Sequence, residues 1–148
     1  MERPCELQIR RCRDEARMPA FAHPGDAGLD LCAAVPCTLK PFERAQIPTG
    51  LQVAIPAGHA GLVLPRSGNA LKLGLTLVNT PGLIDSGYRG ELKVLAINLD
   101  PETSITLEVG DRIAQLVVIA IPDLVIGEVG ELDETQRGEA GLGSSGMR

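Results

Sequence analysis

One stretch of the sequence, GLIDSGYRGE at 82–91, combines side chains that could do chemistry with glycines that let backbone approach a ligand. Asp85 is a candidate general base, because a carboxylate can orient a water molecule and accept its proton. Tyr88 is the only tyrosine of the chain and offers a rigid flat face for a sugar or a base. Arg89 and Glu91 could pair with each other and stiffen the loop. The alternative is an ordinary hairpin whose tyrosine covers one edge of a sheet.

A second polar cluster follows an apolar run in PRSGNALK at 65–72. Arg66 supplies a planar fork that suits phosphate oxygens, Ser67 offers a hydroxyl, and Gly68 allows close backbone approach. If the segment after it is helical, an anion would meet free N–H groups at its start. Taken alone, Arg66 is equally consistent with an ordinary surface residue.

Two single polar residues lie within otherwise apolar runs. Asp30 in AGLDL at 27–31 is by default a turn or capping carboxylate, and its functional alternative is a group that helps to hold a metal. Gln115 in GDRIAQL at 110–116 needs a partner if it is buried. That partner is either a neighbouring backbone group or a ligand.

These residues must be positioned by short strands, because glycines and prolines punctuate the whole chain and no window predicts a long amphipathic helix. Short apolar runs with turns every eight to twelve residues are typical of an antiparallel all-β sandwich or barrel. At most one short helical turn is expected, over 67–72. The expected strands are 51–55, 61–65, 75–78, 91–98, 104–109 and 112–121.

Two of the expected strands, 91–98 and 112–121, are apolar on both faces. In a small domain such a strand usually needs a second sheet or another subunit to cover it, so association of several copies is expected.

The carboxyl-terminal region differs in composition from the rest. Residues 127–136 are acidic, and RGEAGLGSSGMR at 137–148 has almost nothing to bury. One interpretation is a disordered tail. The other is an arm that becomes ordered over a ligand, where successive N–H groups converge on an anion and Arg137 adds a fixed charge. We therefore divide the chain into a β-domain at 1–126, with residues 1–20 an irregular or strand-forming arm, and a flexible Gly-rich arm at 127–148.

Composition restricts the possible partners. The 148-residue chain has a formal net charge of −5, which argues against wrapping a nucleic acid but leaves room for a small anion held by a local arginine cluster. The amino-terminal region resembles neither a signal nor a transit peptide, and no apolar run approaches the ~20 residues that span a membrane. The spacing of Cys5, Cys12, Cys32 and Cys37 matches no zinc pattern. Reduced thiols in a cytoplasmic protein are expected, with disulfides as the alternative.

Together the clusters are far more specific than each one alone. A-G-x-D-L, P-R-S-G, G-x-I-D-x-x-Y-R-G-E, G-D-R-x-A-Q-L and R-G-x-x-G-x-G-S-S-G occur in that order. The chain thereby resembles the trimeric dUTPase family (deoxyuridine triphosphate nucleotidohydrolases) over residues 27–146. The resemblance implies a jelly-roll-like β-fold and a homotrimer with shared active sites. It also implies Mg²⁺-dependent hydrolysis of dUTP to dUMP and pyrophosphate, which keeps uracil out of DNA and supplies dUMP for dTMP synthesis.

The resemblance also implies roles for individual residues. Asp85 would activate the water that attacks the α-phosphorus, and Asp30 would reach Mg²⁺ through water. The hairpin backbone with Asn79 would recognise uracil, and Tyr88 would leave no room for a ribose 2′-hydroxyl. The implied substrate-binding residues are Arg66, Ser67, Gly68, Asn79, Gly82, Ile84, Tyr88, Gln115, Arg137, Leu142, Gly143 and Ser144.

One position departs from the family pattern. The tail commonly carries Phe within G-F-G-S, and here that position is Leu142. Base–aromatic stacking is worth ~1–3 kcal/mol. Leucine keeps an apolar cover over the base but loses this stacking, so we expect the tail to close more weakly over the ligand.

Three other interpretations remain. A dCTP deaminase-type enzyme on the same fold resembles R-S-S where this chain has R-S-G. A non-catalytic nucleotide-binding regulator would be expected to lack a base or a phosphate ligand, and none of the candidate residues is missing. A structural β-protein with a disordered tail would require all five motifs to be accidental.

Overall fold

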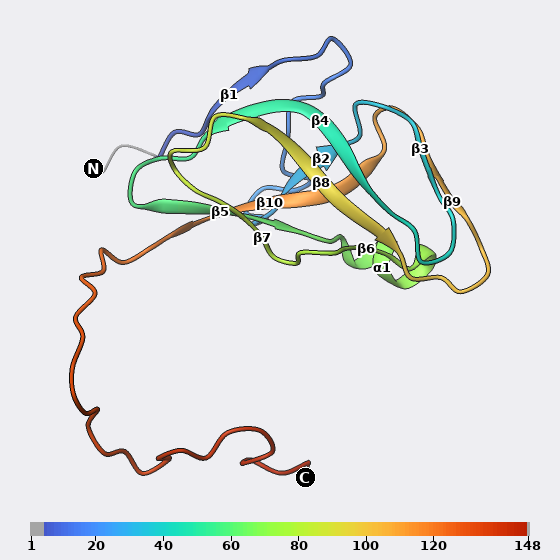
Figure 1. The fold of residues 1–148 in the computed structure, drawn as a ribbon. Helices are drawn as coiled ribbons and strands as arrows, with labels where there is room; N and C mark the ends of the chain where they lie inside the picture. Colours follow the sequence, from blue (N-terminus) through green and yellow to red (C-terminus); the bar gives the residue numbers. More distant parts are fainter. Residues whose placement is uncertain (1–4, 148) are drawn as a thin grey trace.

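The computed structural model describes residues 5–147, which form a β-sandwich followed by an extended tail (Figure 1). One helix, α1 (Ser67–Leu73), is found in this part of the chain, at one end of the sandwich. The strands are β1 (Gln8–Arg11), β2 (Leu29–Cys32), β3 (Cys37–Leu39), β4 (Arg44–Ala54), β5 (His59–Leu64), β6 (Leu75–Leu77), β7 (Gly82–Ile84), β8 (Glu91–Asn98), β9 (Ile105–Leu107) and β10 (Arg112–Ala120).

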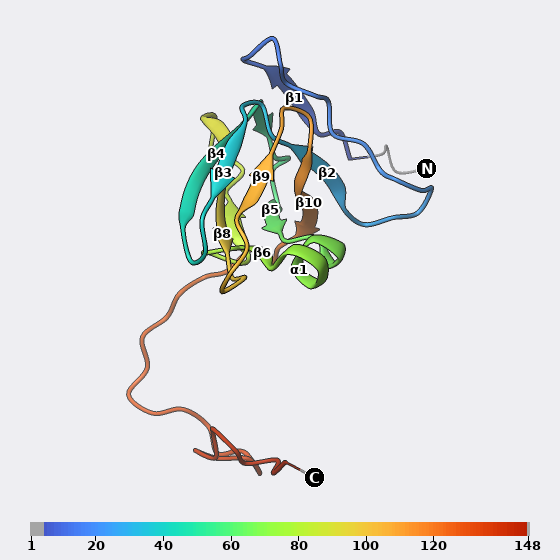
Figure 2. The ribbon, with the colours of Figure 1, turned by 90° about the vertical axis from the view of Figure 1, so that its right-hand side faces the viewer.

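Two four-stranded antiparallel sheets make up most of the sandwich. One sheet has the order β1-β4-β8-β6 and the other the order β2-β10-β5-β7, while β3 and β9 pair in a separate two-stranded sheet. Figure 2 shows β4 and β8 on one side of the molecule and β5, β10 and β2 on the other. The all-β fold of short strands with one short helix, predicted from the sequence, is confirmed.

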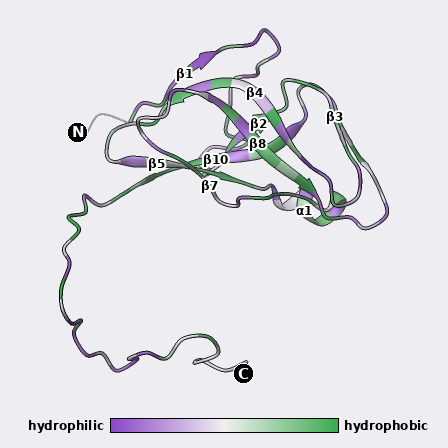
Figure 3. Cartoon of the chain, in the orientation of Figure 1, coloured by the Kyte–Doolittle hydropathy of each residue, from purple (hydrophilic) through white to green (hydrophobic). Residues whose placement is uncertain are grey.

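The core between the sheets is aliphatic. Along β8 every second side chain is buried, and Leu92, Val94 and Ala96 point into the core, as the two-residue period of a strand requires. Hydrophobic and hydrophilic segments accordingly alternate along the strands (Figure 3). The two phenylalanines, Phe21 and Phe42, lie outside this core, with 53% and 63% of their surface exposed.

The expected strand at 51–55 is wrong in its extent, because β4 begins at Arg44 and passes through a proline. β1 pairs with β4 only over residues 51–54, so at Pro48 strand β4 pairs with β8 alone, and the register shifts between Pro48 and Gln52. Proline is found in sheets at such edges and bulges, where no ladder hydrogen bond needs its missing N–H. Strands β1, β2, β3 and β7 were not predicted individually.

The tail from residue 121 to 147 contains neither helix nor strand and leads away from the sandwich (Figure 1). In this tail the side chains of Leu124, Val125 and Ile126 are 76%, 97% and 98% exposed. Within residues 5–147 no helix is long and apolar enough to cross a membrane.

One buried amide connects the end of β8 to two neighbouring segments. Asn98 is fully buried, and its Nδ2 donates to the carbonyl oxygens of Leu39, at 3.0 Å, and Thr103, at 2.9 Å. Its Oδ1 accepts a hydrogen bond from the Asp100 backbone N–H at 2.8 Å. Both N–H groups and the carbonyl oxygen of this side chain are therefore hydrogen-bonded, and these three bonds fix the β8–β9 connection.

We predict that Asn98→Ala lowers the free energy of unfolding by about 2–4 kcal/mol, because it leaves buried carbonyl and N–H groups without partners. Denaturant unfolding at a fixed protein concentration measures this loss. Thr38→Ala is the matched control, since Thr38 is exposed and its hydroxyl has only a 3.5 Å contact with Thr106. Equal stability of the two variants would contradict the role given to Asn98.

Candidate active site

Three segments far apart in sequence meet at one end of the second sheet. β10 lies between β2 and β5, and its register places Gln115 opposite Asp30 on one side and Leu64 on the other. β5 ends at Leu64, which pairs with Gln115, so Arg66 follows two residues after this pair. The sheet pairing thus brings an acid, an amide and a guanidinium group together.

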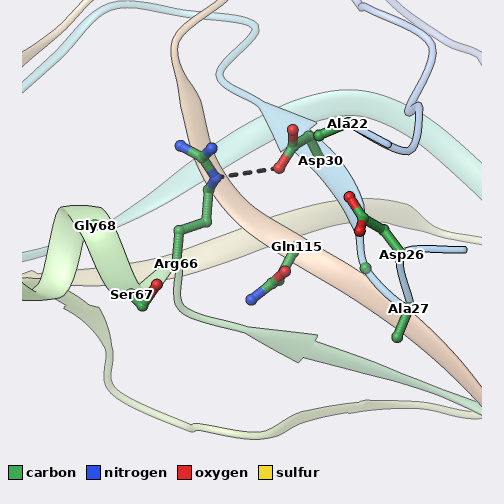
Figure 4. Close-up of a pocket in the computed structure, with 9 residues that line it drawn as sticks. Ala22, Asp26, Ala27, Asp30, Arg66, Ser67, Gly68 and Gln115 are labelled. Carbon is green, nitrogen blue, oxygen red and sulfur yellow. Dashed lines mark ion pairs between the residues drawn. The ribbon is translucent and has the colours of Figure 1, made fainter. Parts of the chain in front are cut away.

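The side chains of this cluster are connected by polar contacts. Arg66 Nε lies 3.1 Å from Asp30 Oδ1, and Arg112 Nε lies 3.6 Å from Asp30 Oδ2. Figure 4 shows Arg66 reaching across to Asp30 with Gln115 beside them. Gln115 Nε2 donates to the carbonyl oxygen of Pro65 at 2.9 Å. Of the two partners expected for this residue, a backbone group or a ligand, the structure therefore shows the backbone group. The turn or cap expected at Asp30 is wrong, because this residue lies within β2.

Asp30, Arg66 and Gln115 line an open pocket of about 390 Å³, which we call the phosphate-type pocket. Ser67 and Gly68, the first residues of α1, complete one wall (Figure 4). Gly28 forms part of the opposite wall, where a Cβ atom would lie 3.1 Å from Gln115 Cδ. Glycine is therefore required at residue 28 for the Gln115 side chain to keep its place.

The sequence did not single out two charged residues of this region. Asp26 lines the phosphate-type pocket, and Arg112 forms the second ion pair of Asp30. Arg112 belongs to the G-D-R motif and could have been found there. Asp26 stands in a loop, where its carboxylate accepts from the His23 N–H at 2.9 Å, and no sequence signal indicated it.

The carboxylates of this pocket fit only indirect contact with Mg²⁺. No cluster of three or more His, Cys, Asp or Glu side chains suited to a metal occurs within residues 5–147. Both Asp30 oxygens already face guanidinium groups. Such a carboxylate fits contact through water with an ion held mainly by a ligand's phosphates, since Mg²⁺ keeps several of its waters.

A second pocket of about 270 Å³, the nucleoside-type pocket, lies beside the turn between β7 and β8. Four of the predicted site residues line it: Asn79, Ile84, Asp85 and Tyr88. The backbone of β7 carries Gly82, where a Cβ atom would lie 3.2 Å from the Asn79 Nδ2 atom. Gln46 and Lys93, from β4 and β8, also line this pocket, and neither was predicted from the sequence.

The turn that carries Tyr88 is held by its own backbone. The Tyr88 N–H donates to the Asp85 carbonyl at 3.1 Å, and Arg89 Nη1 donates to the Ser86 carbonyl at 2.7 Å. The expected pairing of Arg89 with Glu91 is wrong. Glu91 instead pairs with Arg13 at 2.6 Å, because the Arg89 guanidinium is engaged by the carbonyl groups of the turn.

The Tyr88 ring folds back over the end of the turn. Its hydroxyl donates to the Glu91 carbonyl at 3.0 Å, and a Cβ atom at Gly90 would lie 2.6 Å from the ring carbon Cζ. The ring remains 43% exposed, so one face of it is open to the pocket. Glycine at residue 90 is what lets the ring take this position.

The two pockets share no lining residue. The predicted tail residues lie in neither of them. Arg137 Nε donates to the Ala140 carbonyl at 2.9 Å, and Leu142 is fully exposed in the extended tail, followed by Gly143 and Ser144. A single chain therefore presents two separate groups of candidate residues and a tail apart from both.

Comparison with known proteins gives these pockets a family context. The sequence profile of the dUTPase family matches residues 14–146, nearly the whole chain. This chain belongs to the dUTPase family. The match confirms the resemblance stated from the sequence motifs.

Named relatives agree with this assignment. A deoxyuridine 5′-triphosphate nucleotidohydrolase of Streptomyces avermitilis is 50% identical over 97% of this chain and 82% of the relative. One from Corynebacterium diphtheriae is 49% identical over 99% of this chain and 96% of the relative. The chain is therefore an enzyme of the nucleotidohydrolase class.

Solved structures of phage dUTPases share the fold. A Staphylococcus bacteriophage 80alpha dUTPase variant with dUpNHpp superposes with a TM-score of 0.89 at 33% identity, covering 95% of this chain and 98% of that chain. A dUTPase variant from phage phi11 of S. aureus, described with a structural Mg(II) ion, has a TM-score of 0.81 at 30% identity, covering 87% of this chain and 99% of that chain.

We predict that Gly90→Ala displaces the Tyr88 ring, because the added methyl group would overlap it. Since the chain has one tyrosine and no tryptophan, tyrosine fluorescence reports this ring alone, and acrylamide quenching should increase. Gly87→Ala is the matched control in the same turn, because nothing lies within 4 Å of a Cβ atom there. Identical quenching in the two variants would show that Gly90 does not set the ring position.

Proposed function

We propose that this enzyme hydrolyses dUTP to dUMP and pyrophosphate by attack of an Asp85-activated water on the α-phosphorus. The observation that carries the proposal is that the polar residues predicted from the motifs line two pockets. Arg66, Ser67 and Gln115 line the phosphate-type pocket. Asn79, Asp85 and Tyr88 line the nucleoside-type pocket. The similarity to nucleotidohydrolases and to a dUTPase solved with the dUTP analogue dUpNHpp supports the choice of substrate. The reaction removes dUTP and yields dUMP for dTMP synthesis.

The triphosphate would bind at the phosphate-type pocket. The Arg66 guanidinium offers paired donors to phosphate oxygens, and Ser67 and Gln115 add a hydroxyl and an amide. Arg66 is held by its 3.1 Å contact with Asp30, so it is already extended across the pocket before a ligand arrives. Such preorganisation reduces the ordering cost of binding.

The nucleoside would bind at the second pocket. The backbone of β7 at Gly82 and Ile84, with the Asn79 amide, offers donors and acceptors to the edge of uracil. Sites built from such groups reject bases that leave them unpaired. The Tyr88 ring would pack against the sugar and leave no room for a 2′-hydroxyl.

Asp85 would act as the general base. Its carboxylate is exposed in the pocket that Tyr88 lines, so it can reach a water molecule on the nucleoside side of the α-phosphate. Accepting the proton of that water would make it a stronger nucleophile as the bond to pyrophosphate breaks.

Mg²⁺ is the cofactor we propose, held by the triphosphate with Asp30 contributing through water. When bound it would supply charge neutralisation on the phosphate oxygens. Asp30 itself would orient Arg66 and offer a carboxylate oxygen to an ion-bound water molecule.

We propose that the site is completed in a homotrimer. The separation of the two pockets on one chain supports this arrangement, because one nucleotide must contact both sets of residues. Exposed apolar side chains also support it, since Leu83 on β7 and Ile119 on β10 are 63% and 38% exposed. The four free cysteines support a reducing compartment such as the cytoplasm.

The tail would close over the bound nucleotide. Arg137 would hold the far end of the triphosphate, and the backbone at Gly143 and Ser144 would contact it as well. Leu142 would cover the base. The exposed, extended course of these residues supports a segment that can move to a ligand.

We predict that the enzyme releases pyrophosphate from dUTP with Mg²⁺, far less from dTTP, dCTP or UTP, and none in EDTA. Asp85→Asn should lower kcat at least about 10²-fold, because the water then loses its base. Asp123→Asn, an exposed carboxylate outside both pockets, is the matched control. Ammonia release from dCTP would instead favour a deaminase, and no release from dUTP would favour a non-catalytic nucleotide binder.

Leu142→Phe should lower KM for dUTP by up to about ten-fold, because a stacked ring adds about 1.4 kcal/mol to base cover. Initial-rate kinetics measure this, with Leu132→Phe, an exposed leucine earlier in the tail, as the control. An unchanged KM would mean that residue 142 does not cover the base.

Deletion of residues 137–148 should depress kcat much more than it changes stability, because a closing lid completes the site. Thermal unfolding of the same protein separates the two effects. Full activity without these residues would remove the tail from the mechanism.

A further inference from the structure

An ion pair at the border of the nucleoside-type pocket, which Glu91 lines and Arg13 does not, fixes the end of the Tyr88 turn. Arg13 Nε and Nη2 lie 2.6 Å and 3.2 Å from the two Glu91 carboxylate oxygens, so the pair is bidentate. Glu91 Oε1 also accepts the Gly50 backbone N–H at 3.0 Å. Three donors therefore hold a single carboxylate.

This pair differs from an ordinary surface ion pair in its burial and geometry. The Glu91 side chain is only 13% exposed, against 40% for Arg13. The hydrogen bond from Arg13 and that from Gly50 lower the pKa of Glu91, so the carboxylate is charged at neutral pH. Planar guanidinium–carboxylate pairing also fixes direction, which a single contact would not do.

Glu91 joins this pair to the tyrosine. It is the first residue of β8, and its carbonyl oxygen accepts the hydrogen bond of the Tyr88 hydroxyl at 3.0 Å. The side chain and the carbonyl of one residue thus anchor Arg13 on one side and the Tyr88 ring on the other. Movement of Glu91 would move the acceptor of the tyrosine.

The segment that carries Arg13 is itself fixed to the sheet. The Cys12 N–H donates to the Gly50 carbonyl at 2.8 Å, and Ala16 is buried against Gly50. Gly50 has a φ of +71°, which favours glycine, and its N–H and C=O bind Glu91 and Cys12 respectively. The Arg13 side chain therefore extends from a segment whose backbone is fixed to β4 at Gly50.

We propose that Arg13 is a positioning residue that holds Tyr88 through Glu91 and thereby contributes to the discrimination of deoxyribose from ribose. The positioning rests on the contacts above. The sugar discrimination rests on the proposed function, in which the Tyr88 ring excludes the 2′-hydroxyl.

The first test measures kcat/KM for dUTP and for UTP in Arg13→Ala, Glu91→Gln and the double variant. The dUTP-to-UTP ratio should fall by about ten-fold in each single variant, since small misplacements of a positioned group are costly. The double variant should be no worse than the single ones, because both remove one interaction. Arg13→Lys should restore part of the ratio, since lysine keeps the charge but not the fork.

The second test follows Tyr88 without any substrate. Acrylamide quenching of the single tyrosine should increase in Arg13→Ala and Glu91→Gln relative to the unaltered protein. The matched control is Arg11→Ala, two residues away, whose exposed side chain has no ion pair within residues 5–147. That variant should keep both the quenching and the nucleotide ratio of the unaltered protein.

The outcomes separate the inference from the proposed function. A lower melting temperature in Arg13→Ala with unchanged quenching and an unchanged ratio would overturn the inference, because it would show a structural role only. Hydrolysis of neither nucleotide by the unaltered protein would overturn the proposed function and the sugar discrimination. The quenching data would still decide in that case whether Arg13 holds Tyr88.

Discussion

The hydrogen-bond ladder on both sides of β10 is the constraint on which the phosphate-type pocket depends. It sets Gln115 beside Asp30 and opposite the last residue of β5, so that Arg66 must emerge next to them. A register shift by one residue would turn Gln115 to the other face of the sheet. The buried side chains of Ile113, Ala114 and Leu116 work against such a shift, because they would have to leave the core. Core packing and ligand chemistry are therefore specified by the same strand.

The nucleoside-type pocket follows a different principle, because its key groups lie on a turn rather than within a ladder. A turn exposed to solvent needs its own support, and here the Arg89 guanidinium binds the carbonyl groups of residues 86 and 88. Glycine at residue 90 leaves the space that the tyrosine ring occupies. The Glu91 side chain then joins the turn to Arg13, in the segment after β1, and to Gly50 in β4.

The sequence predicted the fold class and the bounds of β8, and it singled out polar residues that line each pocket, because these features leave local signals. A strand buried on alternate positions shows its period, and the motif residues occur in fixed spacings. Three features left no such signal. Asp30 lies in a strand too short to show a period. The first half of β4 contains a proline, which sequence rules restrict to edges and bulges of sheets. The partner of Glu91 is Arg13, 78 residues away, so only the folded chain reveals this pair and corrects the expected pairing with Arg89.

The junction at Gly50 has a consequence for handling the protein at its amino end. The edge strand β1 contributes little to the core, because only Ile9 of its four residues is partly buried. From Cys12 onward the chain is tied to Gly50, which in turn is bound to the residue that opens β8. Shortening the protein past this point would remove support from the Tyr88 turn, whose Glu91 is 78 residues further along the chain than Arg13. The amino-terminal limit of a minimal folded fragment is therefore set by the contacts of Gly50.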